Sequence, residues 1–171
     1  QPPEISAHAA YVMDADTGDT LYAKNADDRT YPGSTTKIMT GILGVELGKA
    51  QGKMDQPLNI TNDVYNIESD ASVLGIDPGD QITLRHALTG MMTVSGCDAA
   101  VAVAETVTPT QADFVAKMNE KAAALGCTNT HFANPHGLPD SDHYSTARDM
   151  ATIAAYGMKM PEFRDMVSHS E

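Results

Sequence analysis

The feature that most constrains the fold is the segment 99–107, which is apolar on nearly every face. It reads Ala-Ala-Val-Ala-Val-Ala-Glu-Thr-Val, with Asp98 placed to cap a helix that begins there. A helix without a polar face has to be covered on all sides by other elements. We therefore expect this helix at the centre of the molecule, surrounded by other helices.

Five further segments have the apolar spacing and the end signals of helices. Thr83 precedes one as a predicted N-cap, and Thr146 with Asp149 forms the start of another in the manner of a capping box. Gly126 closes a third, and Pro161 opens the last. The predicted helices are 34–48, 84–92, 111–125, 147–158 and 162–167.

Strand signals are confined to the first third of the chain. Residues 8–15 alternate loosely, 16–19 read as a turn, and 20–23 return as a second strand, which predicts a β-hairpin. Residues 56–61 are a candidate short strand, and 62–73 read as irregular or weakly helical. The fold class is therefore mixed α+β, mostly helical with a small antiparallel sheet.

Composition narrows the class of partner. The 171 residues suit about one domain. The net charge of −12 disfavours nucleic acid and anionic membranes as partners, because their phosphates would be repelled. The N-terminal residues have neither a basic nor an apolar region, so we expect that any signal peptide has already been removed.

Ser34 and Lys37 are the candidate catalytic pair. They follow the turn Pro32-Gly33 and lie three residues apart, so that both side chains share one face of the predicted helix. The positive end of the helix dipole lowers the pKa of an amine there, and a neutral amine beside a hydroxyl activates it as a nucleophile. The alternative is that Ser34 is only an N-cap and Lys37 a solvated side chain.

Two later motifs extend the pattern. Ser95-Gly96-Cys97 interrupts two helical runs, and Asn134-Pro135-His136-Gly137-Leu138 lies in the long irregular segment 127–144. In order and spacing, these motifs resemble the serine D-alanyl-D-alanine carboxypeptidases, the low-molecular-mass penicillin-binding proteins.

The resemblance implies the serine β-lactamase/penicillin-binding (transpeptidase-like) fold, a helical subdomain beside an antiparallel sheet. Residues 1–33 would supply the hairpin of the sheet, and 34–171 the nucleophile helix and the helical subdomain. The whole of 1–171 would then be one incomplete domain.

The resemblance also implies roles for individual residues. Ser34 would attack the carbonyl between two D-alanines, Lys37 would take its proton, and Ser95 would relay a proton to the leaving amine. Cys97 and His136 would contact the substrate. The implied partners are the peptidoglycan pentapeptide ending in D-Ala-D-Ala and β-lactam antibiotics, outside the cytoplasm, with no cofactor and no metal.

Two departures from the family pattern stand out. Cys97 replaces the usual Asn, and a thiol is a poor hydrogen-bonding group. No Lys-Thr-Gly or Lys-Ser-Gly follows Ser95, so we expect the chain to be an N-terminal portion that is inactive alone. Because a two-stranded hairpin is marginal by itself, we expect the missing C-terminal part, or a swapped copy, to complete the sheet.

Several alternatives remain open at this stage. A catalytically silent wall-binding module would keep the same scaffold, and the sequence does not separate carboxypeptidase from transpeptidase. A β-lactamase needs a deacylating Glu, and 127–144 contains none. His131, His136 and His143 lack the spacing of metal ligands. We expect Cys97 and Cys127 to be unpaired, with Cys127 a small buried hydrophobe.

Overall fold

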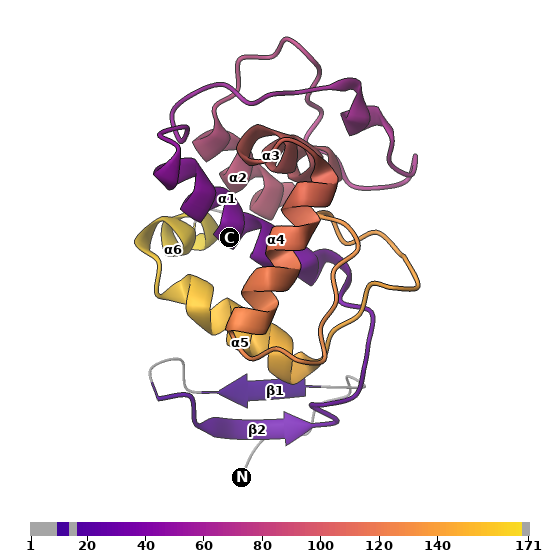
Figure 1. Ribbon diagram of the computed structural model, residues 1–171, viewed down its shortest axis with the longest axis vertical. Coiled ribbons are helices and arrows are strands. Elements are labelled where there is room, and N and C mark those ends of the chain that lie inside the picture. The colour runs from indigo at the N-terminus through magenta and orange to yellow at the C-terminus, as the bar shows by residue number, and fades with distance from the viewer. Residues whose placement is uncertain (1–9, 14–16, 169–171) are drawn as a thin grey trace.

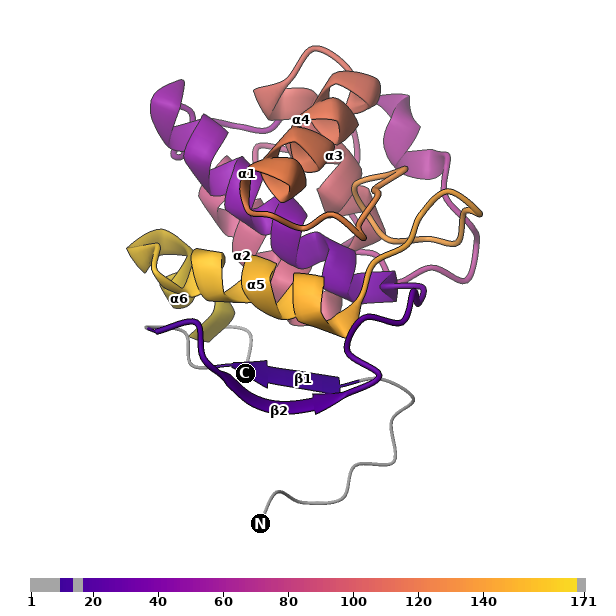
Figure 2. The ribbon, with the colours of Figure 1, turned by 60° about the horizontal axis from the view of Figure 1, so that its bottom comes forward.

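The molecule is built as a hairpin at one end, a covering helix, and a group of helices beyond it (Figures 1 and 2). In this computed structural model, the described residues are 10–13 and 17–168. None of the helices in these ranges is both long and apolar enough to span a membrane.

The predicted hairpin is present. Strands β1 (Ala10–Met13) and β2 (Thr20–Lys24) pair antiparallel, with an irregularity between Val12 and Met13. The other predicted strand residues, 8, 9, 14 and 15, and Asp16 of the turn lie outside the described residues. Helix α5 (Ala147–Met158) lies against β1 and separates the hairpin from the other helices (Figure 2).

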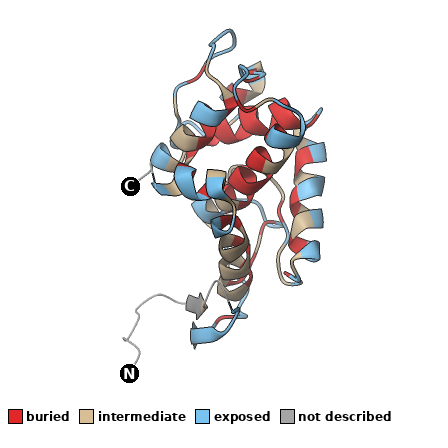
Figure 3. Cartoon of the chain, turned by 90° about the vertical axis from the view of Figure 1, so that its left-hand side faces the viewer, coloured by how far each residue is buried: buried red, intermediate tan, exposed pale blue. Residues whose placement is uncertain are grey.

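The central helix is α3 (Cys97–Val107), and all eleven of its residues are buried. It packs against α1 (Thr36–Ala50), α2 (Leu84–Val94) and α4 (Gln111–Ala124), and Figure 3 shows the buried residues gathered where these helices meet. The prediction that an all-apolar helix is central is confirmed, because burying it removes its apolar surface from water on every side.

Three threonines cap the N-termini of helices, and two of them, Thr83 and Thr146, were predicted to do so from the sequence. Thr83, Thr110 and Thr146 accept hydrogen bonds from backbone N–H groups in the first turns of α2, α4 and α5. Each hydroxyl therefore satisfies a donor that has no partner within the helix. The last helix, α6 (Pro161–Ser168), begins at its proline.

Small residues on α1 let it approach its neighbours closely. A Cβ added at Gly44 would lie 2.7 Å from a methyl of Leu88 on α2 and 3.0 Å from one of Val103 on α3. At Gly48, a Cβ would lie 2.6 Å from Leu84. The glycines thus set the depth at which α1 sits in the core, and with it the position of the helix N-terminus.

Two predictions about local structure are wrong: the short strand at 56–61 and the N-cap role of Asp98. Residues 56–61 form no strand but a single bridge between Pro57 and Thr83. Two backbone hydrogen bonds frame this bridge, from the Leu58 N–H to the Ile82 carbonyl and from the Leu84 N–H to the Gln56 carbonyl. The pairing ends there because the partner segment turns into helix α2 at Leu84. Downstream, Asn62–Tyr65 form the short 3₁₀ helix η2.

Asp98 is not an N-cap. Helix α3 begins at Cys97, two residues before the predicted start at residue 99, and its N-cap is Gly96. The carboxylate of Asp98 instead accepts backbone N–H groups from the segment 74–76, as well as from Ala99. The carboxylate binds these distant donors and does not act as a local cap, because three N–H groups converge on it and it is buried.

Candidate active site

Ser34 lies at the entrance to α1, within the short 3₁₀ helix η1 (Gly33–Thr35). The turn places Gly33 at φ +57°, in the left-handed region that glycine adopts without strain. The prediction that Ser34 sits at the mouth of the helix is confirmed. Its hydroxyl is exposed and caps nothing; within the described part of the chain it makes no hydrogen bond, so it is free to meet a ligand.

Lys37 lies one turn further along, and its side chain is only 3% exposed. Its Nζ donates to Ser95 Oγ at 3.2 Å and to the carbonyl oxygen of His136 at 2.8 Å. Burial lowers the pKa of the Lys37 amine, against the neighbouring Cys97 thiol, which raises it. The sequence predicted the lowered pKa of Lys37 from the helix dipole, and the structure adds a second cause, the removal of the amine from water.

Ser95 joins α2 to α3 in a left-handed conformation, with φ 55° and ψ 44°. This conformation is uncommon for a residue with a side chain. Cys97 follows at the first position of α3 and is only 3% exposed. Its thiol therefore faces the interior near Lys37, and the role of Cys97 as a substrate contact remains a prediction.

The segment 127–144 closes over the N-terminal half of α1. Thr40 Oγ1 donates to the carbonyl of Pro135 at 2.6 Å, and the ring of His143 lies 2.7 Å from Thr36 Oγ1. Gly137 has φ +88°, and a Cβ there would lie 2.1 Å from the carbonyl oxygen of Gly33. Only glycine therefore allows this loop to touch the turn that carries Ser34.

Thr36 and Thr40 were not singled out in the sequence, and His143 was considered there only as a metal ligand. Thr36 and Thr40 lie four residues apart and flank Lys37, so the three share the face of α1 that meets the loop. A polar stripe on an otherwise buried helix was the available signal. His143 carried no such signal, because its partner lies 107 residues away.

The imidazole of His136 is turned towards its own loop. Its Nδ1 accepts the N–H of Leu138 at 3.1 Å, whereas its main-chain carbonyl meets Lys37. Burial, with the charges of Lys37 and His143, lowers the pKa of His136 to about 4. The ring is thus neutral at neutral pH and anchors the loop, and a substrate contact by His136 is again a prediction.

The sequence of the chain matches a known protein family. A family profile described as D-alanyl-D-alanine carboxypeptidase matches residues 1–171. The chain belongs to the D-alanyl-D-alanine carboxypeptidase family. The resemblance inferred from its motifs is therefore confirmed.

Individual members of this carboxypeptidase family match most of the chain. DacF of Bacillus subtilis is 41% identical over 149 residues, or 86% of this chain. The crystal structure of DacD from Francisella tularensis covers 96% of this chain with a TM-score of 0.89 and 38% identity. A Streptomyces DD-transpeptidase covers 97% with a TM-score of 0.86 and 39% identity.

These matches cover only part of each relative. The chain spans 38% of B. subtilis DacF, 42% of DacA from Haemophilus influenzae, 40% of the Francisella structure and 66% of the Streptomyces structure. At these identities and TM-scores the chain shares their fold, and the predicted mixed α+β, penicillin-binding-protein-like class is confirmed.

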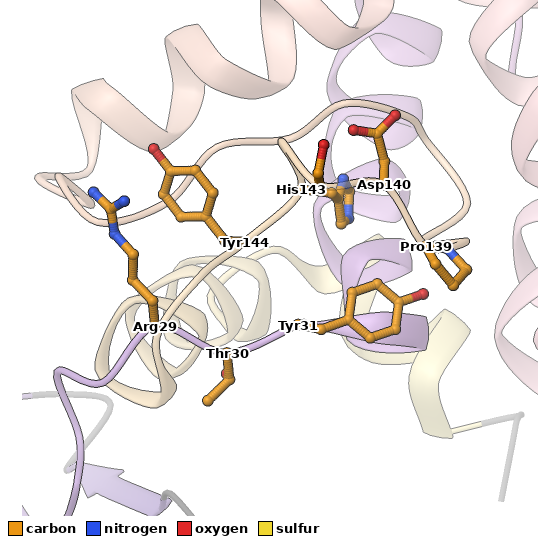
Figure 4. Close-up of a pocket in the computed structure, with 8 residues that line it drawn as sticks. Arg29, Thr30, Tyr31, Pro139, Asp140, His143 and Tyr144 are labelled. Atoms are coloured by element: carbon orange, nitrogen blue, oxygen red, sulfur yellow. The ribbon is translucent and has the colours of Figure 1, made fainter.

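An open pocket of about 520 Å³ lies between residues 29–31 and the C-terminal part of the segment 127–144 (Figure 4). At one end of the pocket, the guanidinium of Arg29 lies 4.2 Å from the ring centre of Tyr144. Tyr31 also lines the pocket and donates its hydroxyl to the carbonyl of Gly137. Ser34, Lys37 and Ser95 do not line it, so the pocket flanks the candidate site and is separate from it.

Histidines and cysteines form no further centre in the described parts of the chain. There, no three His, Cys, Asp or Glu side chains are grouped to hold a metal ion. Cys97 and Cys127 are both free and buried. Burial raises the pKa of the Cys127 thiol to about 12, which agrees with its interpretation as a small hydrophobe.

Proposed function

We propose that this protein is a serine D-Ala-D-Ala carboxypeptidase that acts on peptidoglycan stem peptides through an acyl-enzyme on Ser34. The observation that carries the proposal is the placement of Lys37. Its buried amine, with a lowered pKa, is held between Ser95 Oγ and the His136 carbonyl, one turn from an exposed serine. This arrangement suits a general base next to a nucleophile.

The first half of the reaction forms the ester. Ser34 Oγ attacks the carbonyl carbon of the penultimate D-alanine, and its proton passes to the neutral amine of Lys37. The C–N bond then breaks, and Ser95 passes a proton from Lys37 to the departing nitrogen, which leaves as D-alanine. The 3.2 Å contact between Lys37 Nζ and Ser95 Oγ supplies the path for that transfer.

The second half restores the enzyme. Water attacks the ester carbonyl and gives a proton to Lys37; the bond from the carbonyl carbon to Ser34 Oγ then breaks, and Lys37 returns that proton to Ser34 Oγ as the shortened peptide leaves. An amine in place of water would give transpeptidation. A β-lactam amide would acylate Ser34 in the same way, and its adduct is the convenient probe. Because the substrate belongs to the cell wall, we place the protein outside the cytoplasm.

Covalent labelling of the full-length protein tests the proposal. A fluorescent penicillin should give a band on a denaturing gel that is lost in Ser34→Ala. Thr35→Ala is the matched control, because Thr35 is the neighbouring exposed hydroxyl and bonds only to the carbonyl of Pro32. The control should label like the wild type.

The other outcomes have distinct meanings. Labelling that survives Ser34→Ala would place the nucleophile elsewhere. Rapid release of hydrolysed penicillin would indicate a β-lactamase, and no adduct at all would indicate a catalytically silent module. Release of D-alanine from a D-Ala-D-Ala peptide, with and without an added amine acceptor, separates hydrolysis from transfer.

A further inference from the structure

Hydrogen bonds join the segment 72–76 to the start of α3, with donors and acceptors on both segments. The Ser72 carbonyl accepts the N–H of Cys97 at 2.8 Å. In the other direction, Asp98 Oδ1 accepts the N–H of Leu74 at 2.7 Å, and Oδ2 accepts those of Gly75 and Ile76 at 2.8 and 3.1 Å. Asp98 is only 3% exposed, so these bonds are shielded from water.

These hydrogen bonds bring Leu74 and the Asp98 carboxylate close to Gly96, the residue between Ser95 and Cys97. A Cβ added to Gly96 would lie 3.1 Å from the Leu74 nitrogen and 3.2 Å from Asp98 Oδ1. The peptide that follows Ser95 is therefore enclosed by the segment 72–76 and the carboxylate. A side chain at residue 96 would therefore make tight contacts with Leu74 and Asp98, which would have to shift by a few tenths of an ångström, although the φ of Gly96 is ordinary.

Ser95 needs such support. A left-handed conformation is unfavourable for a residue with a side chain, and it persists only where the surroundings enforce it. The C-terminus of α2 holds Ser95 from one side, through the N–H groups of Ser95 and Gly96 on the Met91 carbonyl. The other side is held by the bonds that converge on Cys97 and Asp98.

We propose that Asp98 is a positioning residue: its carboxylate, by fixing the segment 72–76 against α3, holds Ser95 in the conformation that presents its hydroxyl to Lys37. This inference rests on the proposed function and adds to it a residue that does not touch the substrate. Asp98 acts through Ser95.

The chemistry of the contact requires a carboxylate. The two oxygens of a carboxylate only accept hydrogen bonds, and here they meet four backbone N–H donors, three from the segment 74–76 and one from Ala99. An amide of the same shape keeps one oxygen and turns an NH₂ donor towards at least one of the N–H groups. Asp98→Asn therefore removes some of the hydrogen bonds between the side chain and the segment 74–76 while keeping the side-chain volume.

The experiment measures the rate constant of Ser34 acylation by a fluorescent penicillin in the full-length protein. We expect Asp98→Asn to lower it by about 10-fold or more, as expected when a catalytic group is misplaced. Asp149→Asn is the matched control. Asp149 is also buried in the first turn of a helix and accepts a loop N–H, from Asn129, but contacts none of the candidate site residues.

A double-mutant cycle separates positioning from general destabilisation. If Asp98 acts through Ser95, Asp98→Asn should add little to the loss already caused by Ser95→Ala, because coupled sites are not additive. If the two losses multiply, Asp98 does not act through Ser95 and the inference fails. The control Asp149→Asn should lower the melting temperature yet leave the rate constant within about 3-fold of wild type.

The remaining outcomes are also decisive. Should Asp98→Asn not fold, Gly96→Ala would disturb the same contacts with the carboxylate retained, and the same cycle with Ser95→Ala applies. A wild-type protein that is not labelled on Ser34 overturns the proposed function. A wild-type protein labelled on Ser34 at the same rate as Asp98→Asn overturns only this inference.

Discussion

Acid should destabilise the fold through His136. In the folded protein its Nδ1 accepts the N–H of Leu138, and the ring is half-buried near Lys37 and His143. Protonation would remove that acceptor and place a positive charge beside the amine of Lys37. The folded state therefore prefers the neutral ring, with a pKa of about 4 against an ordinary value of 6.5.

The sign and size of the effect follow from linkage. Because the folded pKa lies below the unfolded one, the stability from the neutral ring is complete above about pH 6.5 and is lost as the pH falls towards about 4. A pKa lowered from 6.5 to about 4 corresponds to a loss of about 2 kcal/mol between about pH 7.5 and 5, with roughly another 1 kcal/mol below that.

Urea unfolding of the wild type and of His136→Gln at about pH 7.5 and 5 provides the measurement. Carboxylates also titrate in this window, and burial lowers the pKa of His143 as well, but those groups are present in both proteins. The quantity of interest is the difference between the two pH-dependent losses. Between about pH 7.5 and 5, we expect the free energy of unfolding of the wild type to fall by about 2 kcal/mol more than that of His136→Gln. Equal losses would show that His136 is not held neutral by the fold, and the reasoning would fail.

Two further predictions concern packing and capping. Gly44→Ala should lower the free energy of unfolding by about 1 kcal/mol, because overpacking against the fully buried Leu88 and Val103 outweighs the gain in helix propensity. If urea unfolding finds the variant more stable, the side chains of Leu88 and Val103 move aside at little cost and the reasoning is wrong. Thr110→Ala should cost about 1 kcal/mol, because its hydroxyl accepts the N–H of Asp113 at the start of α4; an unchanged midpoint of thermal unfolding would contradict this.

Much of the fold could be read from local signals. The threonine caps of α2, α4 and α5, the hairpin and the central position of α3 depend on residues close together in the chain, so neighbouring side chains carry the information. Ser34 at the mouth of a helix with Lys37 one turn on was likewise local. The later motifs linked that pair to Ser95 through a family resemblance that the profile match confirms.

The contacts that give the candidate site its chemistry were decided by the tertiary structure. Lys37 meets Ser95 and the His136 carbonyl, 58 and 99 residues away, and no local pattern states that a carbonyl, not an imidazole, will face the amine. The same holds for Asp98: its sequence position predicts a cap, yet the donors of 74–76 take its carboxylate. The sequence by itself determines which groups are available and, where a local cap such as Thr83 or Thr146 operates, where a helix begins. Which donor meets which acceptor is settled only when packing brings distant segments together, because buried polar groups take the partners that the folded chain places within reach.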